Sequence, residues 1–200
     1  MDQAPLIGPA GDPFALFAEW FSAAAAQEPL ADAMTLATVT PAGRPAARMV
    51  LLKGHGPDGF VFYTNSHSRK GLELAGNPYG ALTFHWKATR RQVRIEGAFG
   101  PVTPAEADAY FASRVRESQI GAWASLQSET LAKRETLVER YRSAETRYAG
   151  GPVPRPPHWT GYRLVPDMIE FWQDVPNRLH DRLVFEREGT SPWTSRRLYP

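Results

Sequence analysis

The spacing of apolar residues predicts one leading helix. Phe14, Phe17 and Phe21 fall on one stripe at helical spacing, which indicates a helix over residues 13–27. Asp12 stands at the N-cap position of this helix, directly before a proline in its first turn. The stripe is aromatic, so we expect the helix to pack on the protein core.

After this helix the apolar period changes to two, which is typical of strands. Residues 35–40, 46–53 and 60–64 predict three strands, and the turn-forming residues at 41–43 and 56–59 join them into a meander.

Helices and strands then follow one another without a regular alternation. The remaining predicted elements are a helix over 68–75, strands over 81–87 and 91–99, helices over 103–115 and 129–148, and strands within 161–198. The helix at 103 has the clearest start, because Thr103, Pro104 and Glu106 form a capping box. This order indicates an α+β fold built on an antiparallel sheet or barrel with flanking helices.

The domain organisation predicted from the sequence is simple. No repeat, low-complexity tract or linker divides the 200 residues, so we expect a single domain over 12–200. Residues 1–11 are expected to be a disordered N-terminal segment.

Composition narrows the class of protein. Cysteine is absent, which excludes disulfides and thiolate metal sites and favours a reducing, cytoplasmic location. The 23 basic and 21 acidic residues nearly balance, which argues against nucleic acid as a partner. No apolar segment is long enough to span a membrane, and the five histidines lack the spacing of metal ligands. Of the basic residues 19 are arginine, the residue favoured for phosphate and carboxylate recognition.

Two groups of residues suggest phosphate recognition. Arg69 and Lys70 stand where a strand passes into a helix, and a helix N-terminus with two cations suits an anion; a solvated cationic turn is the alternative. Tyr110, Arg114 and Ser118 are spaced four apart and share a face if they lie on one helix. They could hold a phosphomonoester, or they could belong to an ordinary amphipathic helix.

Two strand segments also carry candidate residues. Arg178, His180 and Arg182 lie on one face if the segment is extended, with Asp181 pointing the other way, and the alternative is a solvated edge strand. Arg48 and Lys53 end an apolar run and fall on opposite faces of a regular strand. Such a run is either a core strand with snorkelling ends or a strand that lies along a ligand.

Five blocks of the sequence then resemble the pyridoxine/pyridoxamine 5'-phosphate oxidase family. They are RMVLLK at 48–53, FVFYTNSHSRK at 60–70, RRQVRIEG at 90–97, YFASRVRESQIGAWASLQS at 110–128, and IEFWQ with NRLHDR within 169–182. The likeness extends from about Asp12 to Pro200. It implies an FMN-binding split barrel and a homodimer with FMN at the subunit interface.

The resemblance also implies the reaction and its residues. A hydride passes from the substrate C4' to the flavin N5, and O2 reoxidises the flavin to give hydrogen peroxide, so that pyridoxamine or pyridoxine 5'-phosphate becomes pyridoxal 5'-phosphate. The implied FMN contacts are Arg48, Met49, Val50, Leu51, Leu52, Lys53, Tyr63, Thr64, Arg69, Lys70, Gln92, Gln127, Ser128, Trp172 and Arg182. The implied substrate contacts are Lys53, Tyr110, Arg114, Ser118, Arg178 and His180, with Arg178 and His180 as the catalytic pair that orients the pyridine.

Two departures and two alternatives accompany this resemblance. Residues 1–11 contain no Arg or Tyr for closing over a substrate, and Asp174 stands where glycine is more common in the family. A related flavin oxidase acting on another aromatic substrate is one alternative, and a non-catalytic flavin or pyridoxal-phosphate carrier is the other.

Overall fold

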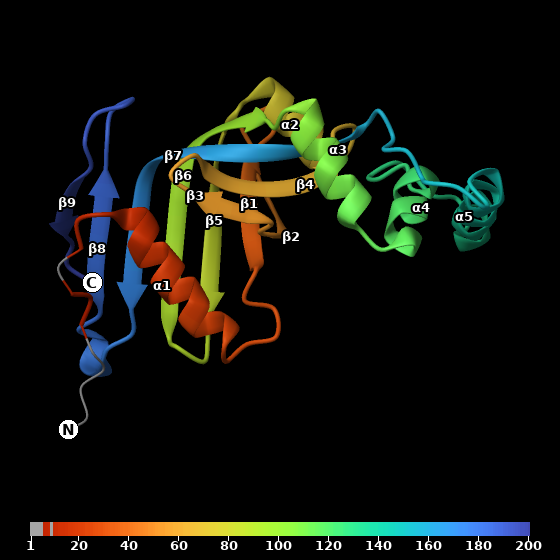
Figure 1. Cartoon of the computed structure of the whole chain (residues 1–200). Helices are drawn as coiled ribbons and strands as arrows, with labels where there is room; N and C mark the ends of the chain where they lie inside the picture. Colours follow the sequence, from red (N-terminus) through yellow and green to blue (C-terminus); the bar gives the residue numbers. More distant parts are fainter. Residues whose placement is uncertain (1–5, 9) are drawn as a thin grey trace.

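An antiparallel sheet that curls on itself forms the body of the protein (Figure 1). The computed structural model describes residues 6–8 and 10–200. Within them the strands are β1 Ala33–Val39, β2 Pro45–Leu51, β3 Gly54–Gly56, β4 Gly59–Asn65, β5 Tyr79–Trp86, β6 Arg91–Pro101, β7 Trp159–Gln173, β8 Asp181–Glu186 and β9 Thr194–Arg197. The helices are α1 Pro13–Ala25, α2 Arg69–Gly76, α3 Pro104–Ser113, α4 Arg116–Ala124 and α5 Arg134–Arg147, with a short 3-10 turn η1 at Pro176–Arg178. The predicted α+β architecture on an antiparallel sheet is confirmed.

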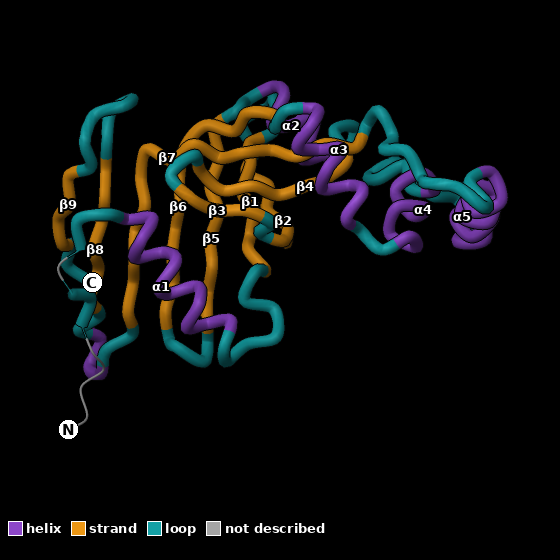
Figure 2. The backbone as a smooth tube through the Cα atoms, in the orientation of Figure 1, coloured by secondary structure: helices purple, strands orange, loops and turns teal. Residues whose placement is uncertain are grey.

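The long strand β7 explains why the barrel is split. The strands run in the order β2-β1-β5-β6-β7-β4-β3, so β6 lies along one edge of β7. On the other edge, residues 159–164 of β7 pair with β4, whereas residues 168–173 pair with β8. The sheet therefore divides at the middle of β7, and β8 with β9 forms an arm away from the barrel (Figure 2).

A β-bulge and a glycine allow β6 to stay paired with β7 where the sheet divides. The β6–β7 register shifts between Glu96 and Gly97. A Cβ on Gly97 would lie 2.2 Å from the carbonyl oxygen of Val165, so only glycine fits this close approach.

Aromatic side chains from α1 and the sheet form the main core. Asp12 accepts a hydrogen bond from the Phe14 amide at 2.9 Å, which confirms the predicted N-cap. The Phe17 ring then packs edge-on to Phe60 at 4.8 Å between centroids, and Trp20 packs on Phe171 at 5.2 Å. Helix α1 thus covers one face of the curled sheet (Figure 1).

The helices α3, α4 and α5 form a lobe beside the barrel (Figure 1). The lobe has its own small core, in which Phe111 and Ile120 pack with Trp159 at the start of β7. The predicted helix over 103–115 ends at Ser113, and α4 was not predicted. Backbone torsions turn extended at residues 114–115, although no glycine or proline marks the break.

Part of the segment predicted to be disordered makes defined contacts. Residues 1–5 and 9 lie outside the described residues. Ile7, however, is buried, and its amide donates to Asp181 Oδ2 at 2.8 Å. Arg197 donates to the Ile7 carbonyl oxygen at 2.5 Å and pairs with Asp181. These contacts hold Ile7 against the β8–β9 arm.

Candidate functional site

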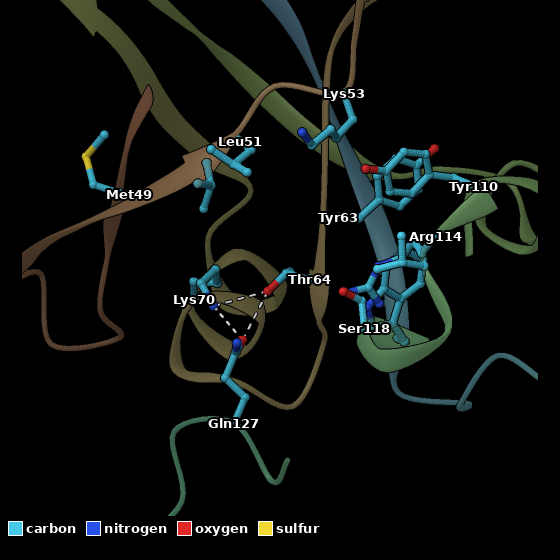
Figure 3. A pocket seen from close by; sticks show the side chains of 13 residues that line it. Met49, Leu51, Lys53, Tyr63, Thr64, Lys70, Tyr110, Arg114, Ser118 and Gln127 are labelled. Atoms are coloured by element: carbon cyan, nitrogen blue, oxygen red, sulfur yellow. Dashed lines mark hydrogen bonds between the residues drawn. The ribbon is translucent and has the colours of Figure 1, made fainter. Parts of the chain in front are cut away.

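A cavity of about 470 Å³ opens beside the edge strand β2, and we call it the β2 cavity (Figure 3). The predicted site residues that line it are Met49, Val50, Leu51, Lys53, Tyr63, Thr64, Lys70, Tyr110, Arg114, Ser118 and Gln127. Val115 and Trp159 line it as well and were not among the predicted residues. The cavity thus lies between the barrel and the helical lobe.

A half-buried lysine lies on one side of this cavity. Lys70 Nζ donates to Thr64 Oγ1 at 3.1 Å and to Gln127 Oε1 at 2.8 Å (Figure 3). It also donates to Ser68 Oγ at 3.1 Å. Burial, and then the nearby charge of Arg48, lower the pKa of Lys70. Lys70 follows the first residue of α2, where the helix dipole favours an anion.

Two of the predicted cofactor arginines do not line the cavity and instead share one carboxylate. Arg48 Nη2 lies 2.7 Å from Glu73 Oε2, and Arg69 Nε lies 2.8 Å from Glu73 Oε1. Glu73 was not among the predicted residues, although its position four residues after Arg69 on a helix is a visible ion-pair spacing.

The opposite side of the cavity is aromatic. The Tyr63 and Tyr110 rings stack at 4.0 Å between centroids with an angle of 10°, and Trp159 stacks on Tyr63 at 5.2 Å. Burial, followed by the charge of Glu106, raises the pKa of Tyr63. These rings come from three different elements and form one flat wall.

Arg114 lies against this wall with an unpaired nitrogen. Its guanidinium carbon is 5.0 Å from the centre of the Trp159 ring, a cation–π distance. Nη1 is buried without a hydrogen-bond partner in the described part of the chain, and burial lowers the pKa of the group. A ligand with an anionic oxygen would satisfy this donor.

The expectation that Tyr110, Arg114 and Ser118 share one helix face is wrong. Tyr110 lies on α3, Arg114 is the residue after that helix, and Ser118 lies on α4. The three side chains still line one cavity, because the chain turns between the two helices (Figure 3).

The β2 side of the cavity combines a paired lysine with exposed apolar side chains. Lys53 follows the end of β2, and its Nζ lies 2.7 Å from Asp32 Oδ2. Met49 and Leu51 are 62% and 42% exposed, so this edge strand presents apolar surface. Leu52, by contrast, packs its side chain into the core, so only its backbone is available to a ligand.

A second group of predicted residues lies elsewhere, on the strands β6, β7 and β8. Trp172 pairs with Gln92 on one side and with Arg182 on the other, and the His180 ring lies 4.7 Å from Trp172. We call these four residues the Trp172 cluster. None of them lines the β2 cavity.

The expectation of one extended segment through Arg178, His180 and Arg182 is wrong. Pro176 begins a 3-10 turn, Asn177 and Arg178 have positive φ angles of 62° and 63°, and β8 begins only at Asp181. No hydrogen bond or ion pair joins Arg178 to the Trp172 cluster within residues 6–8 and 10–200.

His180 is held by two neighbours from the loop before β8. Its Nδ1 accepts a hydrogen bond from the Val175 amide at 3.2 Å and lies 3.1 Å from Asp174 Oδ1. The unusual Asp174 therefore contacts a predicted catalytic residue.

Ser128, another predicted FMN contact, follows Gln127 and has a positive φ of 76°.

The residues present fit the cofactor that the resemblance implies. Lys53, Lys70 and Arg114 give the β2 cavity positive charge, which suits a phosphate group. The exposed Met49 and Leu51 offer apolar surface to a planar ring. In the described part of the chain no group of three or more potential ligands could hold a metal ion, and no helix has the length and hydrophobicity for a membrane crossing.

The split antiparallel sheet with a cationic cavity at its edge strand defines a protein of the FMN-binding split-barrel class. Residues 22–148 match the family model described as Pyridoxamine 5'-phosphate oxidase. Residues 159–200 match the Pyridoxine 5'-phosphate oxidase C-terminal dimerisation region. The chain therefore belongs to the pyridoxine/pyridoxamine 5'-phosphate oxidase family.

Individual relatives agree with this assignment. A protein of Sphingopyxis alaskensis named pyridoxine/pyridoxamine 5'-phosphate oxidase is 61% identical over 190 residues, which cover 94% of this chain and 88% of that protein. A protein of the same name from Gluconobacter oxydans is 56% identical over 201 residues and covers 100% of both chains.

Solved structures share the fold. The structure of PhzG from Burkholderia lata, in complex with tetrahydrophenazine-1-carboxylic acid, has a TM-score of 0.89 and 34% identity, covering 96% of this chain and 94% of that chain. An FMN-binding protein of Nostoc punctiforme has a TM-score of 0.77 at 18% identity, covering 97% of this chain and 100% of that chain. The second likeness supports the fold alone.

Proposed function

We propose that the protein oxidises pyridoxamine 5'-phosphate and pyridoxine 5'-phosphate to pyridoxal 5'-phosphate, with FMN as cofactor and O2 as electron acceptor. Hydrogen peroxide is the second product, and ammonia is released from the amine substrate. Relatives at 61% and 56% identity carry the name of this activity.

The observation that carries the proposal is the buried Nη1 of Arg114, for which the described residues supply no hydrogen-bond acceptor. A buried donor without an acceptor costs free energy, and a ligand that supplies the acceptor removes this cost. Ser118 and Tyr110 line the same cavity and add hydroxyl groups. Together they form a clamp that suits the phosphate of the substrate.

Lys70 and the N-terminus of α2 are the natural place for the phosphate of the cofactor. Arg69 lies at the same helix start, and its side chain is 63% exposed. FMN held there would supply the redox chemistry, taking up a hydride from the substrate carbon and returning the electrons to O2. The protein's part is to hold the two phosphates apart, so that the ring of the substrate lies over the flavin.

The Trp172 cluster completes the site from a second copy of the chain. Trp172, His180 and Arg182 of this cluster, together with Arg178, lie within 159–200, the region that matches a dimerisation model. Gln92 lies on β6, outside that region. In a homodimer with two-fold symmetry, the Trp172 cluster of each copy covers the β2 cavity of the other, giving two equal sites. Arg178 and His180 then orient the pyridine ring of the substrate.

The direct test is an oxygen-dependent assay on the FMN-loaded protein. Pyridoxal 5'-phosphate should form from both phosphorylated substrates, with one hydrogen peroxide per product. Bound flavin without product from either substrate would contradict the proposed activity.

A complementation experiment tests the shared site. Arg114→Met and Arg178→Ala chains with different affinity tags are co-expressed, and the heterodimer is isolated by both tags. One of its two sites then has both arginines intact, so activity at low substrate should return to about half of wild type. If both arginines act within one copy, each site carries one defect and activity stays at the level of the variants.

The likeness to PhzG favours one other candidate, oxidation of a carboxylated polycyclic substrate. A guanidinium binds carboxylate as well as phosphate. Turnover of tetrahydrophenazine-1-carboxylic acid, with none of the phosphorylated pyridines, would favour that candidate.

A further inference from the structure

Glu73 is a buried carboxylate placed behind the cations of the β2 cavity. It is 3% exposed, and it comes from α2, the helix that also carries Arg69 and Lys70. Thr38 Oγ1 donates to its Oε2 at 2.5 Å, and Arg48 Nη2 donates to the same oxygen at 2.7 Å.

These contacts keep the carboxylate charged. Burial alone would raise the pKa of Glu73, but the hydrogen bonds from Thr38, Arg69 and Arg48 outweigh it and hold the pKa below its ordinary value. A buried carboxylate is stable only when it is paired and hydrogen-bonded in this way. Glu73 is therefore an anion with a fixed position.

The contacts also restrict the two arginines. Arg69 uses Nε at 2.8 Å for Glu73, which leaves both terminal nitrogens for another acceptor. Arg48 is held on two sides, by Glu73 and by Thr38. Glu73 also raises the pKa of Lys70, against the effects of burial and Arg48, so the three cations and this carboxylate form one electrostatic group.

We propose that Glu73 is a positioning residue for cofactor binding: it fixes the guanidinium groups of Arg48 and Arg69 beside Lys70 and so builds the subsite for the FMN phosphate. This inference rests on the proposed function, because it assigns that phosphate to the start of α2. The net charge of the four groups is then +2, which matches a phosphate dianion.

Two roles of Glu73 predict opposite results for Glu73→Gln. If Glu73 only neutralises charge, its removal raises the net charge to about +3 and FMN binds more tightly. If Glu73 positions the arginines, FMN binds more weakly despite the extra positive charge. Riboflavin has no phosphate, so neither effect should change its affinity.

The experiment measures dissociation constants of FMN and riboflavin by quenching of flavin fluorescence on the cofactor-stripped full chain. For Glu73→Gln we expect FMN affinity to fall about tenfold, as for the loss of one charge-assisted hydrogen bond, with riboflavin affinity unchanged within about twofold. Glu186→Gln is the control, because Glu186 is also a carboxylate paired with arginine, accepting two hydrogen bonds from Arg196, but it lies on the β8–β9 arm. It should change neither constant.

Two further variants extend the test, and the first of them serves even if Glu73→Gln folds poorly. Glu73→Asp keeps the charge but shortens the side chain, and it should weaken FMN in the same direction. In an Arg69→Gln background, Glu73→Gln should cost less FMN affinity than in wild type, because the two residues act through one contact.

Three results would overturn the inference. If FMN affinity rises or stays constant in Glu73→Gln, Glu73 serves charge balance only. If the variant loses affinity for FMN and riboflavin equally, Glu73 serves general folding. A wild-type protein that does not prefer FMN to riboflavin has no phosphate subsite at all. Failure of the proposed function has a different signature, since the wild type then prefers FMN but forms no pyridoxal 5'-phosphate.

Discussion

Replacing Arg114 by methionine should make the cofactor-free protein more stable and the enzyme weaker in binding its substrate. The guanidinium packs on Trp159, and its Nη1 is buried without an acceptor among residues 6–8 and 10–200. Methionine keeps the apolar length of the side chain and removes the unsatisfied donor.

The two effects can be estimated separately. A buried unsatisfied polar group costs about 1–3 kcal/mol, and a cation–π contact of this kind returns about 0.5–1 kcal/mol. Arg114→Met should therefore raise the free energy of unfolding by about 1 kcal/mol, which corresponds to about 2–4 °C in Tm for a chain of this size. Charge-assisted hydrogen bonds to phosphate contribute about 1.5–3 kcal/mol, so KM should rise about 10- to 150-fold.

The assay combines thermal unfolding of the cofactor-free protein with steady-state kinetics on pyridoxamine 5'-phosphate. KM should rise while kcat changes little, because the phosphate lies away from the reacting carbon. Arg116→Met is the matched control: Arg116 donates to the carbonyl oxygens of Tyr148 and Gly151, so its loss should lower Tm and leave KM unchanged. A fall in Tm together with an unchanged KM for Arg114→Met would refute the reasoning.

Four further outcomes are expected. Burial lowers the pKa of Lys70, and a bound phosphate favours its charged form, so FMN affinity should fall as pH rises through this lowered pKa. Riboflavin affinity, measured between about pH 7 and 10, should stay constant. Arg178→Ala should keep the FMN dissociation constant and lower kcat/KM about 100-fold or more in steady-state assays. Asp174→Gly removes the carboxylate 3.1 Å from His180 Nδ1, and KM should rise about threefold with FMN binding unchanged. The pKa of Glu73 is lowered from 4.5, so its ionised form stabilises the fold above pH 4.5, and this stabilisation is lost as the pH falls through the lowered pKa. The urea midpoint of Glu73→Gln should therefore fall less steeply with acid than that of wild type.

Local signals in the sequence predict much of the fold. The capping box at Thr103 is present as expected, with both of its hydrogen bonds to Glu106. Alternating strands and turn residues predict the antiparallel sheet, because side-chain period and turn chemistry are local properties. The break after Ser113 has no such signal, since it depends on how α3 and α4 pack on Trp159.

Some residues of the site could be predicted from the sequence and others could not, again because the sequence carries local signals. Residues that line the β2 cavity were found through the family resemblance and through spacing, as for Lys70 and Arg114. Trp159 was missed because an aromatic residue at the start of a strand looks like any core residue until the lobe is placed. Periodicity also failed at Arg178, where Pro176 starts a turn within a segment that otherwise alternates like a strand.

Three features of the β2 cavity are each unfavourable when taken alone. Met49 and Leu51 expose apolar surface on an edge strand, and Lys70 is charged in a site that lowers its pKa. Arg114 has a buried donor for which the described part of the chain offers no acceptor. A flat ring carrying one phosphate, together with a second phosphate ligand, would relieve all three at once. Since binding of such ligands stabilises only the folded state, these costs in the free chain become the source of affinity in the complex. The same groups that limit the stability of the free protein thus define what it binds.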